Sequence, residues 1–187
     1  MLNENELWLL SFYRLSEING AQFFAQLARN IRQPEIQHNL TRHFSEEAQH
    51  AWLFSDCLRQ LGHEPLKITR TYQDYISDTG LPANLMEILA LTNVFERRVI
   101  NHYTKQVRVQ TQHPLVKETL ERIKQDEYWH LKWVNQALKD MEPVYGKEMI
   151  KDTIARYKEI DDAVYEKLVT EYNQRFAHFH EISHRTQ

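Results

Sequence analysis

Glycine and proline are so scarce in this chain, and so widely spaced, that long segments contain no turn-forming residue. Its 187 residues include four glycines and five prolines, whereas an all-β sandwich or barrel needs a turn about every 8–12 residues. Between these breaks, apolar residues recur every three or four positions, which is the pattern of amphipathic helices. We therefore predict an all-α chain with five helices, over about residues 4–32, 34–61, 82–111, 114–141 and 146–181.

The lengths of the connections predict how these helices are arranged. The first and second helices are joined by very few residues, as are the third and fourth, so each pair should form an antiparallel hairpin. Residues 62–81 join the second helix to the third, and an extended segment of that length spans ~66 Å, which exceeds the ~42 Å of the predicted second helix. We predict one domain of residues 1–187, a four-helix bundle with one long crossover and an additional long C-terminal helix.

One motif occurs twice at corresponding places in the two hairpins. Glu47-x-x-His50 and Glu127-x-x-His130 are 80 residues apart, and the prolines that open the two helices share this offset. The chain contains two further Glu-x-x-His sequences, but neither has a partner at that offset. The repeat therefore indicates that the two motifs lie at the same height in the bundle.

Each hairpin also carries a glutamate opposite its motif. Glu17 and Glu96 lie almost equally far before the two prolines, which places them level with the motifs. The inward-facing positions of all four helices are otherwise mostly apolar, and the acidic residues interrupt them at this single level. We predict that six residues form one buried layer: Glu17, Glu47, His50, Glu96, Glu127 and His130.

Four buried carboxylates require positive charge close by. An unpaired buried carboxylate costs several kcal/mol, whereas two divalent cations balance four negative charges. Such a set, one Glu from each of two helices and Glu-x-x-His from each of the other two, is the ligand set of di-iron and di-manganese bundles. Its oxygen and imidazole donors favour two iron ions, with manganese or a mixed pair as alternatives, and the single Cys57 excludes a Cys₄ site. The competing interpretations are a hydrogen-bonded cluster without metal and a metal that only stabilises the fold.

Two acidic residues beside the motifs are candidates for orienting the histidines. A metal-bound histidine usually donates its second ring N–H to a carboxylate. Asp126 and Glu46 each precede a motif glutamate by one residue. We predict that Asp126 contacts His50 across the bundle and that Glu46 contacts His130.

Three further residues are expected near the layer. Tyr13 lies one turn before Glu17 and Tyr103 two turns after Glu96, so they could relay electrons or protons or serve as packing residues. Gly20, one turn after Glu17, is costly within a helix. It could make room for a ligand or for close helix packing.

The motif set resembles the ferritin-like superfamily, especially its bacterioferritin- and rubrerythrin-type di-iron proteins, over about residues 5–140. The resemblance implies two bridging glutamates and two terminal Glu–His pairs: Glu47 with Glu127, Glu17 with His50, and Glu96 with His130. The chain departs from rubrerythrin in having one cysteine, Val99 in place of an additional glutamate, and Trp129 in place of a common arginine. These departures weigh against a rubrerythrin-type peroxidase.

We therefore expect an oxidoreductase that activates O₂ or peroxide at two metals and acts on a small molecule or on Fe(II), with an electron donor that the motifs do not identify. One alternative is an iron-binding, ferroxidase or storage protein without an organic substrate. Another is a helical interaction module built on the C-terminal helix. The motifs also leave open hydroxylases of quinones, modified RNA bases or fatty aldehydes within the superfamily, and nothing in the sequence selects among them.

Composition excludes several partners and locations. A net charge of −3 does not favour binding to nucleic acid, and the chain has no glycine-rich loop of the kind that binds nucleotide phosphates. The N-terminal apolar run, residues 7–13, is much shorter than the ~20 residues of a spanning helix and follows glutamates rather than the basic residues of a signal peptide. We expect a cytoplasmic protein without a membrane partner that forms a homodimer, with a C-terminal helix that either packs along the bundle or pairs with a second subunit.

Overall fold

A computed structural model describes residues 2–80, 82–109 and 112–172. Over these residues the chain forms helices and no strand, which confirms the all-α prediction. The helices, in chain order, are α1 (Glu4–Asn30), α2 (Pro34–Gln60), α3 (Tyr72–Ser77), α4 (Leu85–Val107), α5 (Pro114–Asp140), α6 (Glu142–Tyr145) and α7 (Lys147–Glu171).

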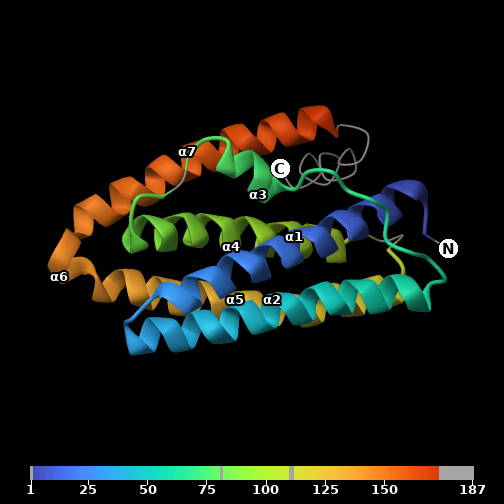
Figure 1. The fold of residues 1–187 in the computed structure, drawn as a ribbon. Coiled ribbons are helices and arrows are strands. Elements are labelled where there is room, and N and C mark those ends of the chain that lie inside the picture. The colour runs from blue at the N-terminus through green and yellow to red at the C-terminus, as the bar shows by residue number, and fades with distance from the viewer. Residues whose placement is uncertain (1, 81, 110–111, 173–187) are drawn as a thin grey trace.

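Helices α1, α2, α4 and α5 form the bundle, and α7 lies along α4 (Figure 1). Helix α1 packs against α2, and α4 against α5, as antiparallel hairpins. After α2 the chain returns along the length of the bundle before α4 begins, so α2 and α4 run in the same direction (Figure 1). This is the predicted ferritin-like arrangement with one long crossover and an additional C-terminal helix.

The helix ends follow local chemistry, which corrects two expected boundaries. Pro34 and Pro114 open α2 and α5, where a missing backbone N–H costs nothing. Pro82, by contrast, does not open α4. The side chain of Asn84 accepts a 3.0 Å hydrogen bond from the backbone N–H of Glu87, so this helix starts at residue 85 and ends at Val107, inside the expected range of 82–111.

Two short helices were not predicted. Helix α3 interrupts the crossover and starts with a capping box, in which the backbone N–H of Thr71 donates to Asp74 Oδ2 at 2.7 Å. Six residues are too few to show a helical period, so the box was its only signal. The single turn of α6 lies between α5 and α7 and ends at Tyr145, and the φ of 81° at the following Gly146 allows the change of direction. Helix α7 ends at Glu171, and the rest of the expected 146–181 helix lies outside the described residues beyond position 172.

The apolar core is divided into two clusters with a polar layer between them. On α1, one cluster contains Leu9 and Tyr13, the other contains Phe24 and Ala28, and Glu17 lies between them. Helices α2, α4 and α5 likewise carry residues of one cluster on each side of the layer. The fold thus surrounds the predicted acidic layer with apolar side chains on both sides. No helix in the described part of the chain is both long enough and apolar enough to cross a bilayer.

Candidate metal centre

The structure brings the six predicted residues together in the middle of the bundle, from four different helices. Each of the six is at most 5% exposed: Glu17, Glu47, His50, Glu96, Glu127 and His130. One potential ligand atom each from Glu17, Glu47, His50 and Glu127 lies within 4.8 Å of the others. A second such group contains Glu47, Glu96 and His130, together with His43.

The two motif glutamates lie between the two groups. Glu127 approaches both histidines, with Oε1 3.3 Å from His50 Nδ1 and Oε2 2.9 Å from His130 Nδ1. Glu47 belongs to both groups, and its Oε1 lies 3.5 Å from His130 Nδ1. Both motif glutamates therefore contact residues of the two groups. Glu17 and Glu96 lie on the outer sides, 3.5 Å from His50 Nδ1 and 3.9 Å from His130 Nδ1.

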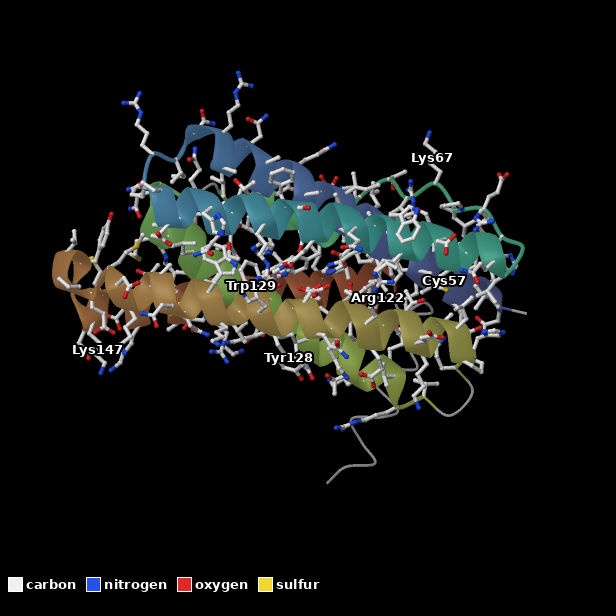
Figure 2. All side chains as sticks on the ribbon, turned by 90° about the horizontal axis from the view of Figure 1, so that it is seen from below. Cys57, Lys67, Arg122, Tyr128, Trp129 and Lys147 are labelled. Atoms are coloured by element: carbon white, nitrogen blue, oxygen red, sulfur yellow. The ribbon has the colours of Figure 1, made fainter. Side chains whose placement is uncertain are left out.

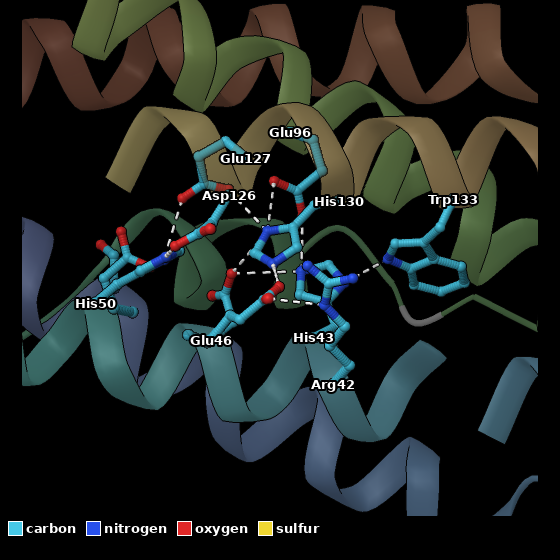
Figure 3. Close-up of polar contacts among 12 residues, drawn as sticks. Arg42, His43, Glu46, His50, Glu96, Asp126, Glu127, His130 and Trp133 are labelled. Carbon is cyan, nitrogen blue, oxygen red and sulfur yellow. Dashed lines mark hydrogen bonds and ion pairs between the residues drawn. The ribbon is translucent and has the colours of Figure 1, made fainter. Parts of the chain in front are cut away.

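The outer nitrogen of each histidine faces an acidic side chain across the α2–α5 interface (Figure 3). His50 Nε2 lies 3.2 Å from Asp126 Oδ2, and His130 Nε2 lies 3.1 Å from Glu46 Oε2. The hydrogen bond with His50 lowers the pKa of Asp126, so this carboxylate is ionised and accepts a hydrogen bond from the ring N–H. Each imidazole therefore carries a proton on Nε2 and turns Nδ1 towards the buried carboxylates.

Glu46 is itself held in place by an arginine. Arg42 Nε donates to Glu46 Oε1 at 2.8 Å, and its guanidinium lies 3.6 Å from the ring centre of Trp129. Figure 2 shows Trp129 at the seam between α2 and α5, on the side of the bundle where these contacts occur. The stack orders Arg42, which in turn limits the movement of the carboxylate that faces His130.

The inner atoms of the layer fit a pair of cations. His50 Nδ1, Glu96 Oε1 and Glu127 Oε1 are buried and have no hydrogen-bond partner. A nitrogen lone pair that faces a carboxylate oxygen is repelled by it unless a proton or a cation lies between them. Burial and the neighbouring carboxylates Glu17 and Glu127 raise the pKa of Glu47, so its negative charge needs such a cation. The donor set of carboxylates and imidazoles suits two divalent metals.

Comparison with known protein families identifies the family of this chain. A family model described as ubiquinone biosynthesis protein COQ7 matches residues 17–159, a range that contains all six residues. The chain belongs to the COQ7 family. This family lies within the ferritin-like di-iron carboxylate superfamily, which confirms the resemblance inferred from the motifs and indicates a di-iron oxygenase. Comparisons with curated proteins and with solved structures gave no match.

The two predicted tyrosines of this COQ7 family protein differ in their contacts. The hydroxyl of Tyr103 donates a short hydrogen bond to Glu17 Oε1. The ring of Tyr13 lies 5.1 Å from that of Tyr103, but its buried hydroxyl has no hydrogen-bond partner. Burial raises the pKa of both phenols, so both remain protonated. Tyr103 thus contacts the layer directly, whereas Tyr13 packs behind it.

His43 is a residue of the layer that the motif analysis missed. It is fully buried, and its Nε2 lies 3.2 Å from Glu96 Oε1 and 3.3 Å from Glu47 Oε1. A signal was present, because His43 precedes Glu47 by four residues and His50 by seven, and therefore lies on the same helix face. Position 123, its counterpart in the 80-residue repeat, is isoleucine, so a search for repeated residues could not find it.

Gly20 makes room for one of the motif glutamates. A Cβ atom built on this glycine would lie 2.2 Å from Glu47 Oε2. Of the two roles expected for Gly20, the structure therefore supports space for a side chain of the layer.

Two cavities adjoin the layer. The smaller one, of about 50 Å³, is bordered by all four carboxylates. The larger one, of about 460 Å³, lies next to Gly20 between α1, α3 and α4. Tyr72, Gln73 and Phe95 line both cavities and form the wall that they share.

Proposed function

We propose that this protein is a di-iron monooxygenase that uses O₂ to hydroxylate the ring of a quinone precursor. The family match supports the di-iron oxygenase, and the description of the family, which names ubiquinone biosynthesis, supports a quinone substrate. The observation that carries the proposal is the buried layer of four carboxylates and two imidazoles, whose unpaired atoms face inward beside a cavity.

Two iron(II) ions bound by this layer would supply the two electrons that begin the reduction of O₂. In the overall reaction, a ring C–H, O₂, two electrons from an external reductant and two protons give a ring C–OH and water. We assign the metal ligands to Glu17, Glu47, His50, Glu96, Glu127 and His130.

The surrounding residues would prepare this centre. Asp126 and Glu46 hold the imidazoles with Nδ1 inward, so that the ligand atoms are oriented before a metal arrives. Tyr103 donates a hydrogen bond to Glu17 and offsets part of its buried charge. The apolar clusters on both sides exclude water from the reacting species. The small cavity suits a diatomic molecule.

The larger cavity suits an organic ring. Its volume of about 460 Å³ falls within the usual ~300–1,000 Å³ of small-molecule sites. Its apolar walls come from Phe23, Phe24, Leu91 and Phe95. Gly20 lies between the cavity and Glu47, and because it has no side chain only its backbone separates them. A ring bound there would lie next to the metal layer.

A single-turnover experiment tests the proposal. Protein loaded with two Fe(II) per chain is mixed with ¹⁸O₂ and a short-chain quinol that lacks one ring hydroxyl, and the product is analysed by mass spectrometry. We expect one ¹⁸O atom in the ring, and no product from Glu96→Ala. Glu118→Gln, which changes an exposed acid on the same helix as the Glu127 motif, is the matched control and should retain activity. Iron oxidation without ring oxygenation would contradict the proposal.

A ferroxidase is the second candidate, because the cavity bordered by the carboxylates has room for Fe(II) and O₂ but not for an organic ring. A ferroxidase would oxidise many equivalents of Fe(II) in succession, whereas a monooxygenase stops after two without reductant.

We also propose a homodimer, which for a 22.5 kDa chain corresponds to about 45 kDa in light scattering. A storage cage would be many times heavier.

A further inference from the structure

Among the described residues, His43 is the one buried imidazole in the layer that the predicted ligand set does not include. Its ring is stacked between Phe24, with ring centres 3.8 Å apart, and His130, with ring centres 3.6 Å apart. The two stacks occupy both faces of the imidazole, so only its two edge nitrogens can make polar contacts. Nδ1 faces Trp133, and Nε2 faces the carboxylate of Glu96 (Figure 3). The carboxylate of Glu47 also lies close to Nε2.

Trp133 determines which of these nitrogens carries the proton. Its indole Nε1–H donates a 3.2 Å hydrogen bond to His43 Nδ1. An indole nitrogen is a donor only, so Nδ1 must offer a lone pair and cannot carry a hydrogen. The imidazolium form is excluded by the same contact, because it has a hydrogen on both nitrogens. The proton of His43 therefore lies on Nε2, the atom that faces the layer.

This arrangement prevents His43 from binding a metal through Nε2. A metal ligand needs a lone pair, and on His43 the lone pair points away from the carboxylates towards Trp133. We propose that His43 is a positioning residue, held by Trp133 in the Nε2–H form, which donates this N–H to Glu96 and Glu47 and is not a seventh metal ligand. In the structure, neither contact of Nε2 has hydrogen-bond geometry, and Glu96 Oε1 is also unpaired, so a small rotation of the carboxylate completes the bond.

The role of His43 matches that of Tyr103 on the other side of the layer. Tyr103 donates its hydroxyl to Glu17, one outer glutamate, and His43 directs its N–H to Glu96, the other. The 80-residue repeat supplies neither donor to the opposite half, since Ile123 stands 80 residues after His43 and Phe23 stands 80 residues before Tyr103. Each outer glutamate thus has one donor of its own, a phenol in one half and an imidazole in the other.

Nitrogen NMR of the wild-type protein tests the proposal directly. Zinc(II) serves as a diamagnetic substitute for iron, and long-range ¹H–¹⁵N correlations report which nitrogen of each histidine is protonated. In the zinc-loaded protein we expect His43 to carry its proton on Nε2, while His50 and His130 show a metal-bound Nδ1. A His43 signal with an unprotonated, metal-shifted Nε2 would overturn the proposal. A protein that binds no zinc would contradict the metal centre itself.

Substitutions with matched controls distinguish a hydrogen-bond donor at position 43 from a metal ligand. Trp133→Phe removes the indole N–H, and we expect His43 then to populate the Nδ1–H form, whereas Trp52→Phe, which changes an exposed indole on α2, should not change it. His43→Leu should still bind two zinc ions per chain, the weaker one about 10–100-fold less tightly, as is usual when a partner of a ligand is lost. His43→Gln, which retains an N–H donor, should recover most of this affinity. Loss of one zinc equivalent from His43→Leu would show that His43 is a ligand.

Discussion

The carboxylate of Glu47 packs directly against the backbone of Gly20, so close that a methyl group on this glycine would come within 2.2 Å of Oε2. The contact joins α1 to α2 at the level of the acidic layer. It places Glu47, the only carboxylate shared by both ligand groups, where a larger residue on α1 would displace it.

The first prediction concerns Gly20→Ala. Alanine normally stabilises a helix interior by about 1 kcal/mol relative to glycine, so the metal-free protein should keep its helix content. The new methyl group, however, would push the carboxylate of Glu47 out of its place, and we expect at least one metal equivalent to be lost or strongly weakened. Elemental analysis and circular dichroism measure the two effects. Unchanged binding of two metals would show that Glu47 is not confined by this contact.

The second prediction concerns the residues that orient the histidines. Asp126→Asn and Glu46→Gln should each lower metal affinity about 10–100-fold, because an uncharged amide oxygen is a weaker acceptor for the Nε2–H of the imidazole than the carboxylate it replaces. Glu118→Gln, on an exposed part of α5, is the control for the loss of one negative charge. Titration with zinc against a chelator gives the affinities. If the control weakens binding as much as the other two variants, net charge rather than orientation is responsible.

The third prediction is the pH dependence of stability without metal. Burial lowers the pKa of His50 and His130, but the surrounding carboxylates outweigh it and raise both values in the folded state. Burial also raises the pKa of Glu47 and Glu96. In all four cases the folded state holds protons that the unfolded state releases, so stability falls as pH rises.

We therefore expect the metal-free protein to be less stable at pH 9 than at pH 7 in urea denaturation. Divalent metal replaces these protons and binds the deprotonated groups, so saturating zinc should reduce or reverse the difference. A metal-free protein that becomes more stable over this interval would contradict the assigned directions.

The fourth prediction concerns the attachment of α7 to the bundle. Arg98 on α4 donates to the buried carboxylate of Asp161 on α7 through Nε at 2.6 Å, and the hydroxyl of Tyr72 on α3 donates to the same group. Asp161→Ala should destabilise the protein by about 3 kcal/mol, at the lower end of the usual cost of breaking a buried pair, since Asp162 remains 2.8 Å from Arg98.

Asp162→Ala provides the matched control for this pair. Its side chain is more than half exposed, and an exposed ion pair contributes at most about 1 kcal/mol. Urea denaturation of both variants gives the comparison. Equal effects of the two substitutions would mean that the buried position of Asp161 adds nothing to the attachment of α7.

Much of the fold follows from local sequence. The prolines at 34 and 114 and the apolar period between breaks predicted four bundle helices, because helix starts and amphipathic faces depend on residues close in the chain. The start of α4 was misplaced, since Pro82 is a conspicuous signal and the cap formed by Asn84 is a subtle one. Helix α3 is too short to show a period.

For the metal layer, residue spacing was enough to predict which glutamates and histidines share one level, because the repeat and the hairpin geometry turn distance along the chain into height. The contacts around these residues became visible only in the packed fold: Gly20 makes room for Glu47, Tyr103 reaches Glu17, and Trp133 turns the proton of His43 towards Glu96. These contacts depend on how helices distant in sequence are rotated and packed, and no local pattern of residues records that rotation.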